Sequence, residues 1–165
     1  MIPLSSVHTA VDSPIGELHL FADENGLTGL YMNTHRDELP KVTSVEVSEN
    51  PFMAQAAQEL QEYFAGNRKE FSVVVDPHGT AFQMRVWKEL LNIPAGKTIS
   101  YGELAKRLGD PLLTRAVGTA NGQNPISIII PCHRVIGANG HLTGYGGGID
   151  KKRWLLDHEA EDTLF

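Results

Sequence analysis

Three short β-prone runs open the chain, at residues 7–12, 17–22 and 27–32. The residues between the runs are typical of tight turns, first Ser13-Pro14-Ile15-Gly16 and then Asp23-Glu24-Asn25-Gly26. Because such short connections join neighbouring strands in opposite directions, the pattern predicts an antiparallel meander.

A helical pattern follows a polar stretch over residues 33–50, which contains one weak strand signal near residues 42–47. Asn50-Pro51 then provides an N-cap and a first-turn proline. Apolar residues recur at every fourth position before Gly66, namely Phe52, Ala56, Leu60 and Phe64. This spacing predicts one amphipathic helix.

Residues 71–75 predict a last strand of the first half, and Asp76-Pro77-His78-Gly79 predicts a turn after it. We therefore expect two domains. Residues 1–79 form an N-terminal strand and helix domain, and residues 80–165 form a C-terminal domain.

The second domain shows mainly helical patterns. Thr80-Ala81-Phe82-Gln83 has the form of a capping box, and the apolar stripe that follows it ends at Pro94. A second capping box, Ser100-Tyr101-Gly102-Glu103, predicts a short helix that stops at Gly109. A further helix is expected over residues 114–122. Two short helices joined by a tight turn resemble a helix-turn-helix.

Residues 126–130 form an apolar run that predicts a buried strand ending at Pro131. Six glycines in residues 137–148 predict a loop that turns tightly or approaches a ligand closely. Asp150 is expected to cap a last helix over residues 151–160. The expected fold class is α/β (α+β), with a small N-terminal antiparallel sheet and helix packed on a mostly helical C-terminal domain that contains the helix-turn-helix.

The composition of the 165 residues, 41% apolar and 21% charged, is that of an ordinary globular protein. No apolar run approaches the ~20 residues that cross a bilayer, and the first residues lack the regions of a signal peptide. We expect a cytoplasmic protein without membrane contact. The net charge of −6 is uneven, because residues 1–79 hold four basic and twelve acidic residues, whereas residues 80–165 hold ten and eight. Only the second half suits a polyanionic partner.

The single cysteine, Cys132, is the first candidate for chemistry. It excludes an internal disulfide and a cysteine-rich zinc site, and a lone cysteine is often a small buried hydrophobe. Here the flanking His133 and Arg134 both favour the nucleophilic thiolate. Neighbouring side chains of an extended chain point to opposite faces, so unless the chain turns there we expect His133 to take the thiol proton through a bridging water. Glu159 and Asp157 are both candidates to orient the other nitrogen of His133.

The other histidines show no metal-ligand spacing, and we expect no metal. The loop at residues 144–148 lacks the features of a phosphate-binding motif, so a backbone contact with a base fits it better. Arg115 lies near the start of the second short helix, where the helix dipole disfavours a cation. The plain interpretation is a solvated arginine. The small residues Ala116, Gly118 and Ala120 would nevertheless let this helix approach a DNA groove closely.

Several of these motifs together resemble the O6-alkylguanine-DNA alkyltransferases, also called methylated-DNA–protein-cysteine methyltransferases. The resemblance is carried by Ile130-Pro131-Cys132-His133-Arg134-Val135, Asn124-Pro125, Arg115-Ala116-Val117-Gly118, Gly144-Tyr145-Gly146-Gly147 and Trp154-Leu155-Leu156-Asp157-His158-Glu159. It covers nearly all of residues 80–165, whereas the first half matches only in its strand and helix layout. Some members bind zinc through cysteines in their first half, and this chain has none there.

The resemblance implies direct reversal of DNA damage without a cofactor. The protein would flip an O6-alkylguanine out of double-stranded DNA and move the alkyl group irreversibly to its own cysteine, one lesion per molecule. Cys132 matches the acceptor, His133 its base and Glu159 the carboxylate that orients the base. Asn124 matches the asparagine that holds the turn before the active-site strand. Tyr101 matches the tyrosine that hydrogen-bonds the guanine.

Arg115 matches the arginine that occupies the space of the flipped nucleotide, with contact through the minor groove. The DNA-binding residues expected with it are Tyr101, Ser100, Thr114 and Gly118. The expected alkylguanine pocket consists of Val135, Tyr145 and Gly146. We expect a monomer, and both cooperative binding to DNA and repair of O4-alkylthymine stay open.

Three other functions would account for some of these features. An alkyltransferase-like lesion sensor would lack the acceptor cysteine, which this chain has at Cys132. A helix-turn-helix regulator would need a dimerisation segment, and none is evident in the sequence. A cysteine hydrolase would need a direct cysteine–histidine pair, which adjacent residues do not easily form.

Overall fold

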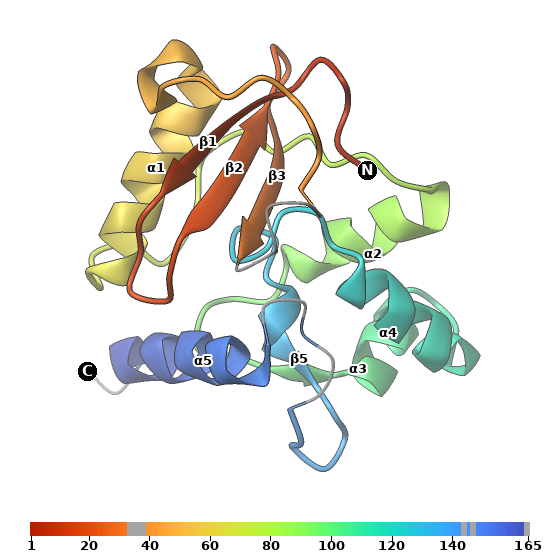
Figure 1. Ribbon diagram of the computed structural model, residues 1–165. Helices are drawn as coiled ribbons and strands as arrows, with labels where there is room; N and C mark the ends of the chain where they lie inside the picture. Colours follow the sequence, from red (N-terminus) through yellow and green to blue (C-terminus); the bar gives the residue numbers. More distant parts are fainter. Residues whose placement is uncertain (33–38, 143–144, 146–147, 164–165) are drawn as a thin grey trace. The chain divides into compact units, whose positions relative to one another are not determined.

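The computed structural model describes residues 1–32, 39–142, 145 and 148–163. The chain divides into an N-terminal unit, Met1–His78 with Pro125–Ser127, and a C-terminal unit, Gly79–Asn124 with Ile128–Phe165. A three-stranded sheet and a long helix make up most of the first, and the second is mainly helical (Figure 1). The predicted mixed fold class is confirmed. Among the described helices, none combines the length and the apolar character that a membrane span requires.

The three predicted strands form one antiparallel sheet. They are β1 (Val7–Val11), β2 (Leu18–Ala22) and β3 (Leu27–Met32), in the spatial order β1-β2-β3. Ala10 lies opposite His19, and Leu20 lies opposite Leu30. The meander expected from the turn residues is confirmed.

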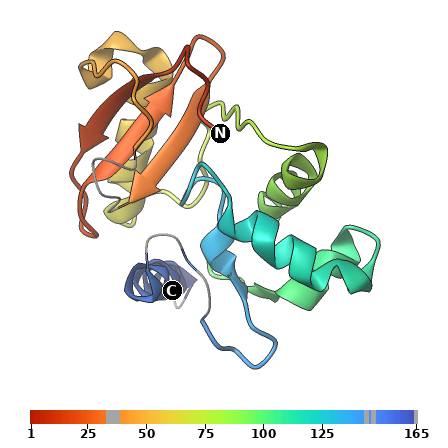
Figure 2. The same ribbon diagram turned by 45° about the vertical axis from the view of Figure 1, so that its right-hand side comes forward.

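Helix α1 (Pro51–Phe64) packs against β2 and β3 of this sheet (Figures 1 and 2). It begins at the predicted place because the Asn50 side chain accepts hydrogen bonds from the backbone N–H groups of Phe52 and Met53. Burial of the apolar stripe holds the helix in place. The fully buried side chains of this unit include Leu18, Leu20, Leu30, Met53, Ala56 and Leu60.

The weak strand expected at residues 42–47 is not formed. A single bridge joins Ser44 to His8, and the chain then enters a 3-10 turn, η2 (Val47–Glu49). The Glu49 side chain accepts a hydrogen bond of 2.7 Å from the Glu46 backbone N–H, which begins this turn. The local capping interaction therefore ends the strand after one pair.

The prediction of a strand at residues 71–75 is also wrong. The buried carboxylate of Glu59 on α1 accepts hydrogen bonds from the backbone N–H groups of Ser72, at 2.8 Å, and Val73, at 3.1 Å. A strand would direct such groups to a neighbouring strand. Only an isolated parallel bridge between Val75 and Leu27 forms here.

The C-terminal unit begins with α2 (Ala81–Leu90), whose predicted capping box at Thr80 is complete. Two short helices follow, α3 (Tyr101–Arg107) and α4 (Thr114–Gly122), with the 3-10 turn η3 (Pro111–Leu113) between them. Helix α4 lies beside α3 and α2, as Figures 1 and 2 show. The predicted helix-turn-helix is confirmed. The Trp87 indole N–H donates to the Ala120 carbonyl at 2.9 Å and thereby ties α2 to α4.

The strand expected at residues 126–130 is replaced by turns. Ile126 makes one bridge with Leu30, and Ile128 takes a φ of 71°, which is uncommon for a β-branched residue. Its side chain is nonetheless 1% exposed. The apolar run thus reflects burial and not an extended backbone, because burial alone does not distinguish the two.

After this turn the chain forms the 3-10 turn η4 (Cys132–Arg134) and the short strand β5 (Val135–Ile136). Strand β5 pairs in parallel with β4 (Ile99–Ser100). The last helix, α5 (Ile149–Thr163), starts one residue before Asp150. Asp150 is therefore in the first turn and not at the predicted cap position, where its charge still complements the helix dipole.

The Glu59 contacts generate a stability prediction. Glu59→Gln removes the charge from two buried hydrogen bonds, and we expect it to lower the free energy of unfolding by ~1–3 kcal/mol. Glu62→Gln is the matched control on the same helix, where the ion pair with Arg68 is partly exposed, and it should cost less than ~1 kcal/mol. Urea unfolding followed by circular dichroism measures both. Equal costs for the two variants would contradict the role given to Glu59.

Candidate active site

Cys132 is the first residue of η4, and its side chain is 5% exposed. It does not follow a strand as predicted, because the chain from Ile128 onward turns instead of extending. The two following residues, His133 and Arg134, are also buried. Three consecutive polar or reactive side chains are thus held inside the C-terminal unit, where each needs a specific partner.

Two asparagines hold the backbone around Cys132. The Asn124 amide donates to the Ile130 carbonyl at 2.7 Å, and the Asn121 amide donates to the Cys132 carbonyl at 3.2 Å. The Asn124 side chain is also hydrogen-bonded to the Cys132 thiol. These bonds bind the end of α4 to η4 and fix the position of the sulfur.

The carboxylate of Glu159 on α5 is the centre of the buried polar network. It accepts from His133 Nε2 at 2.8 Å and from Arg134 Nε at 2.8 Å and Nη2 at 3.0 Å. Arg134 Nη1 donates to the Ile93 carbonyl at 2.6 Å. Of the two carboxylates that the sequence offered as partners for His133, Glu159 makes this contact, and Asp157 is exposed.

These contacts determine the protonation states. Burial alone would raise the pKa of Glu159, but its hydrogen bonds to His133 and Arg134, with the charge of Arg134, hold that pKa well below its usual range. Burial lowers the pKa of His133 in spite of Glu159, and the charges of Arg134 and Lys152 oppose its protonation too. An ionised Glu159 can only accept, so a neutral His133 carries its proton on Nε2. Nδ1 is then the basic nitrogen, and it has no hydrogen-bond partner among the described residues.

The positive charge that favours the thiolate comes from Lys152 on α5. Its ammonium group is buried, donates to the Val135 carbonyl at 2.7 Å and lies 6.0 Å from the centre of the Tyr101 ring. Burial raises the pKa of the Cys132 thiol, and the Asn124 hydrogen bond and the Lys152 charge offset only part of that effect. The guanidinium of Arg134, expected to favour the thiolate, is instead bound to Glu159. Burial therefore favours the thiol form of Cys132 over the thiolate.

The residues expected to bind DNA lie on the helix-turn-helix. Ser100 caps α3 by accepting from the Glu103 backbone N–H at 3.0 Å, which places Tyr101 as the first residue of this helix. Gly118 on α4 faces the Tyr101 ring, since a Cβ there would lie 3.6 Å from it. Thr114 is exposed and donates to the Pro111 carbonyl. Arg115 is exposed, and its guanidinium makes no hydrogen bond or ion pair with any residue that the structure describes.

Two of the three residues expected to form the base pocket lie in the described part of the chain, and they differ in burial. Val135 is fully buried on β5, and its carbonyl is bound to Lys152. Tyr145 is half-buried, and its carbonyl accepts from the Gly148 backbone N–H. Gly146 lies outside the described residues.

Sequence reasoning missed Lys152 and Asn121, and it gave Arg134 the wrong partner. Lys152 looks like an ordinary helix lysine in the sequence, next to Lys151 and Arg153. The spacing of Lys152 and Leu155, both buried, offered a signal, because a lysine three residues before a core leucine lies on the same helix face. Asn121 was interpreted only as a helix end.

One group of side chains in the N-terminal unit has metal-ligand chemistry. Among the described residues, Asp23, Asp76 and His78 bring one ligand atom each to within 4.8 Å of one another. Two of these atoms already pair, since His78 Nε2 lies 3.1 Å from Asp76. Asp23 accepts from the Asn25 backbone N–H at 2.8 Å.

A helix-turn-helix and a buried cysteine with a histidine–carboxylate pair thus occur in one unit. The comparison with known families agrees with this combination. Residues 6–77 match the model of the 6-O-methylguanine DNA methyltransferase ribonuclease-like domain, and residues 81–161 match that of the 6-O-methylguanine DNA methyltransferase DNA binding domain.

Individual proteins give the same result. A methylated-DNA–protein-cysteine methyltransferase of Mycobacterium tuberculosis is 52% identical over 163 residues, which cover 96% of this chain and 98% of that protein. The crystal structure of the M. tuberculosis O6-methylguanine methyltransferase superposes with a TM-score of 0.86 at 49% identity, covering 95% of this chain and 94% of the other. The structure of the M. tuberculosis protein in complex with DNA gives 0.83 at 50% identity, covering 94% of each chain.

The chain belongs to the O6-methylguanine DNA methyltransferase family. It is accordingly a methyltransferase enzyme of DNA repair that works by alkyl transfer, and its partner is DNA.

The Arg134–Glu159 pair generates a prediction with a defined pH dependence. Arg134→Met leaves Glu159 buried without its main cation, and we expect a loss of ~3–5 kcal/mol of unfolding free energy at pH 7. The lowered pKa of Glu159 gives the wild type stability that is complete above the ordinary pKa of 4.5 and is lost as the pH falls through the lowered value. In the variant the pKa of Glu159 rises, so the penalty shrinks on acidification. Urea unfolding between pH 7 and pH 4 should show the two stabilities converging.

The control is Arg153→Met, which removes an exposed arginine from the same helix as Glu159 and should change the stability by less than ~0.5 kcal/mol. A gap between wild type and Arg134→Met that stays constant with pH would contradict the assignment of an ionised Glu159.

Proposed function

We propose that this enzyme repairs O6-alkylguanine in double-stranded DNA by one irreversible transfer of the alkyl group to the sulfur of Cys132. The observation that carries the proposal is the buried Cys132 next to the His133–Glu159 hydrogen bond, in the same unit as the helix-turn-helix. The names of the relatives and the DNA complex of one of them support the substrate and the partner.

In the proposed reaction His133 is the general base. Its Nδ1 accepts the thiol proton through a bridging water, and Glu159 holds the resulting imidazolium. The thiolate attacks the alkyl carbon in line with the O6 leaving group, so the S–C bond forms as the C–O6 bond breaks. Burial raises the pKa of the thiol, and the Asn124 hydrogen bond and the Lys152 charge offset part of that rise, which helps His133 to form the attacking thiolate.

The guanine must leave without a full negative charge. Tyr101 is the donor that we assign to it, because it begins α3 and lies near the Lys152 ammonium, which is 6.0 Å from its ring. Val135, Tyr145 and Gly146 would surround the base, and Asn124 keeps the sulfur in position through its bonds to Ile130 and Cys132. Tyr101 passes a proton to the departing guanine, which leaves as the neutral base; Tyr101 regains a proton from solvent, and His133 releases the thiol proton to solvent.

Single turnover follows from the product. A thioether has no good leaving group, and the chain has no second cysteine that could take the alkyl group away. Each molecule therefore repairs one lesion.

The nucleotide must leave the base stack before it can reach a cysteine that is 5% exposed. Arg115 is the residue that we assign to the space it leaves, because its guanidinium is exposed at the start of α4 and has no protein partner among the described residues. Ser100, Thr114 and Gly118 would lie along the same face, against the minor groove.

Intact-protein mass spectrometry with a duplex that contains one O6-methylguanine tests the proposal. We expect a gain of one methylene group per molecule that saturates at one equivalent, and no gain for Cys132→Ser. Parallel incubation with an O4-methylthymine duplex determines whether that base is also a substrate. Tight lesion binding without any mass gain would instead indicate a sensor.

Arg115 generates a separate prediction. Arg115→Ala should slow methyl transfer from a duplex by at least about tenfold, the equivalent of ~1.4 kcal/mol, because the gap left by the flipped base is no longer filled. Transfer from a single-stranded oligonucleotide, which needs no flipping, should change little. Rapid-quench kinetics measures both rates. Arg115→Lys preserves the charge, so an equal loss on both substrates that Lys restores would mean that Arg115 only contacts phosphate.

A further inference from the structure

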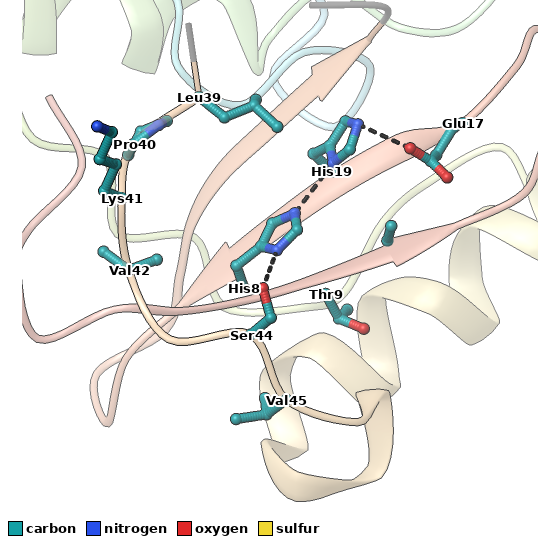
Figure 3. A pocket seen from close by; sticks show the side chains of 11 residues that line it. His8, Thr9, Glu17, His19, Leu39, Pro40, Lys41, Val42, Ser44 and Val45 are labelled. Carbon is teal, nitrogen blue, oxygen red and sulfur yellow. Dashed lines mark hydrogen bonds and ion pairs between the residues drawn. The ribbon is translucent and has the colours of Figure 1, made fainter. Parts of the chain in front are cut away.

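A chain of four polar side chains lies on the N-terminal unit and has no part in the alkyl-transfer site. His8 Nδ1 is 2.9 Å from the Ser44 hydroxyl, His8 Nε2 is 2.9 Å from His19 Nδ1, and His19 Nε2 is 3.1 Å from Glu17. Figure 3 shows the four side chains joined in this order, from the strand surface to the segment that contains Ser44.

The carboxylate at one end determines the direction of every hydrogen bond. An ionised Glu17 only accepts, so His19 Nε2 must donate, and the Nδ1 of a neutral His19 must accept. His8 therefore donates from Nε2 and accepts at Nδ1. The remaining partner of that Nδ1 is the Ser44 hydroxyl, which must donate its proton to His8.

The geometry of the two rings fits a direct hydrogen bond between them. Their planes differ by 15° and their centres are 5.2 Å apart, which fits two rings joined edge to edge by the 2.9 Å hydrogen bond. Two histidines that bind one metal ion would instead direct one nitrogen each to the point where the ion lies. The pair is therefore arranged so that His19 orients the His8 ring.

The backbone holds Ser44 against His8. The His8 N–H donates to the Thr43 carbonyl at 2.9 Å, and the Val45 N–H donates to the His8 carbonyl at 2.8 Å. The Ser44 side chain is thus placed by the edge of β1 and not by a free loop. Burial lowers the pKa of His8, a protonated His19 would lower it further, and Glu17 raises it, so the net direction favours the neutral base.

A cavity of about 430 Å³ lies beside this chain, within the size range of small-molecule sites. All four polar residues line it. Its apolar lining residues are Ala10, Leu39, Pro40, Val42 and Val45. Figure 3 shows Leu39, Pro40 and Val42 on the segment that runs past His8. Apolar side chains of this kind can contact a short acyl group.

We propose that Ser44 is a nucleophile that accepts acyl groups from activated esters bound in this cavity, with His8 as its general base. Ser44 Oγ forms a bond to the carbonyl carbon while its proton moves to His8 Nδ1. The tetrahedral adduct then expels the ester's alkoxide or phenolate, which takes the proton from His8 or leaves as the anion. The products are acyl-Ser44 and the alcohol, and His19 and Glu17 are positioning residues that act through His8.

The test uses the full chain and p-nitrophenyl acetate. We expect release of one equivalent of nitrophenol and an acetyl group on Ser44, located by peptide mass spectrometry. Because a positioned base contributes at least ~10²-fold, His8→Gln should slow the acetylation of Ser44 by about that factor. Ser48, an exposed serine in η2, is the internal control and should stay essentially unmodified.

Ser44→Ala serves as the matched variant. It should abolish the nitrophenol burst and leave methyl transfer to Cys132 unchanged, which shows that the chain is folded. Acetylation of Ser44 no faster than that of Ser48, or unaffected by His8→Gln, would overturn the proposal.

The positioning role of Glu17 has its own readout. The charged and titratable groups that face His8 are His19, Glu17 and Lys41. Removal of the Glu17 charge by Glu17→Gln lowers the pKa of His8, so the acid limb of the acetylation rate should move to lower pH. A loss of rate without a shift of the acid limb to lower pH would contradict the positioning role of Glu17.

Discussion

The chemistry of the C-terminal unit depends on one buried carboxylate. Glu159 is 1% exposed, and it stays ionised there because Arg134 binds both of its oxygens and His133 binds one. This group joins α5 to the turn that carries the cysteine, and it forces His133 into the tautomer whose Nδ1 is basic. A carboxylate without Arg134 would take up a proton in such surroundings and could then no longer act as an acceptor only.

Cys132 is buried like Glu159, and this burial disfavours the reactive thiolate form of its side chain. The thiol is surrounded by protein, which raises its pKa, while Lys152 and Asn124 lower it only in part. A permanent thiolate would be oxidised or alkylated without regard to the substrate. A buried thiol with a base nearby fits the role of alkyl acceptor that we propose for Cys132.

Local signals in the sequence were reliable where one residue acts on its neighbours. The turns of the meander, the Asn50 and Thr80 caps and both helices of the helix-turn-helix were all predicted. The errors at residues 42–47, 71–75 and 126–130 were all runs taken as strands. In each case a side chain binds a backbone group that a strand would have paired with a neighbouring strand. These side chains are Glu49, Glu59 and Asn124.

Cys132 and His133 could be predicted as reactive candidates from the sequence because the two residues are adjacent, but the 3-10 turn that carries them could not. Tertiary structure decided between Glu159 and Asp157, moved Arg134 from the thiol to the carboxylate and brought Lys152 to Val135. These contacts join residues 17 to 26 positions apart along the chain. Charges in a low-dielectric interior act according to distance in space, and that distance exists only after the chain has folded.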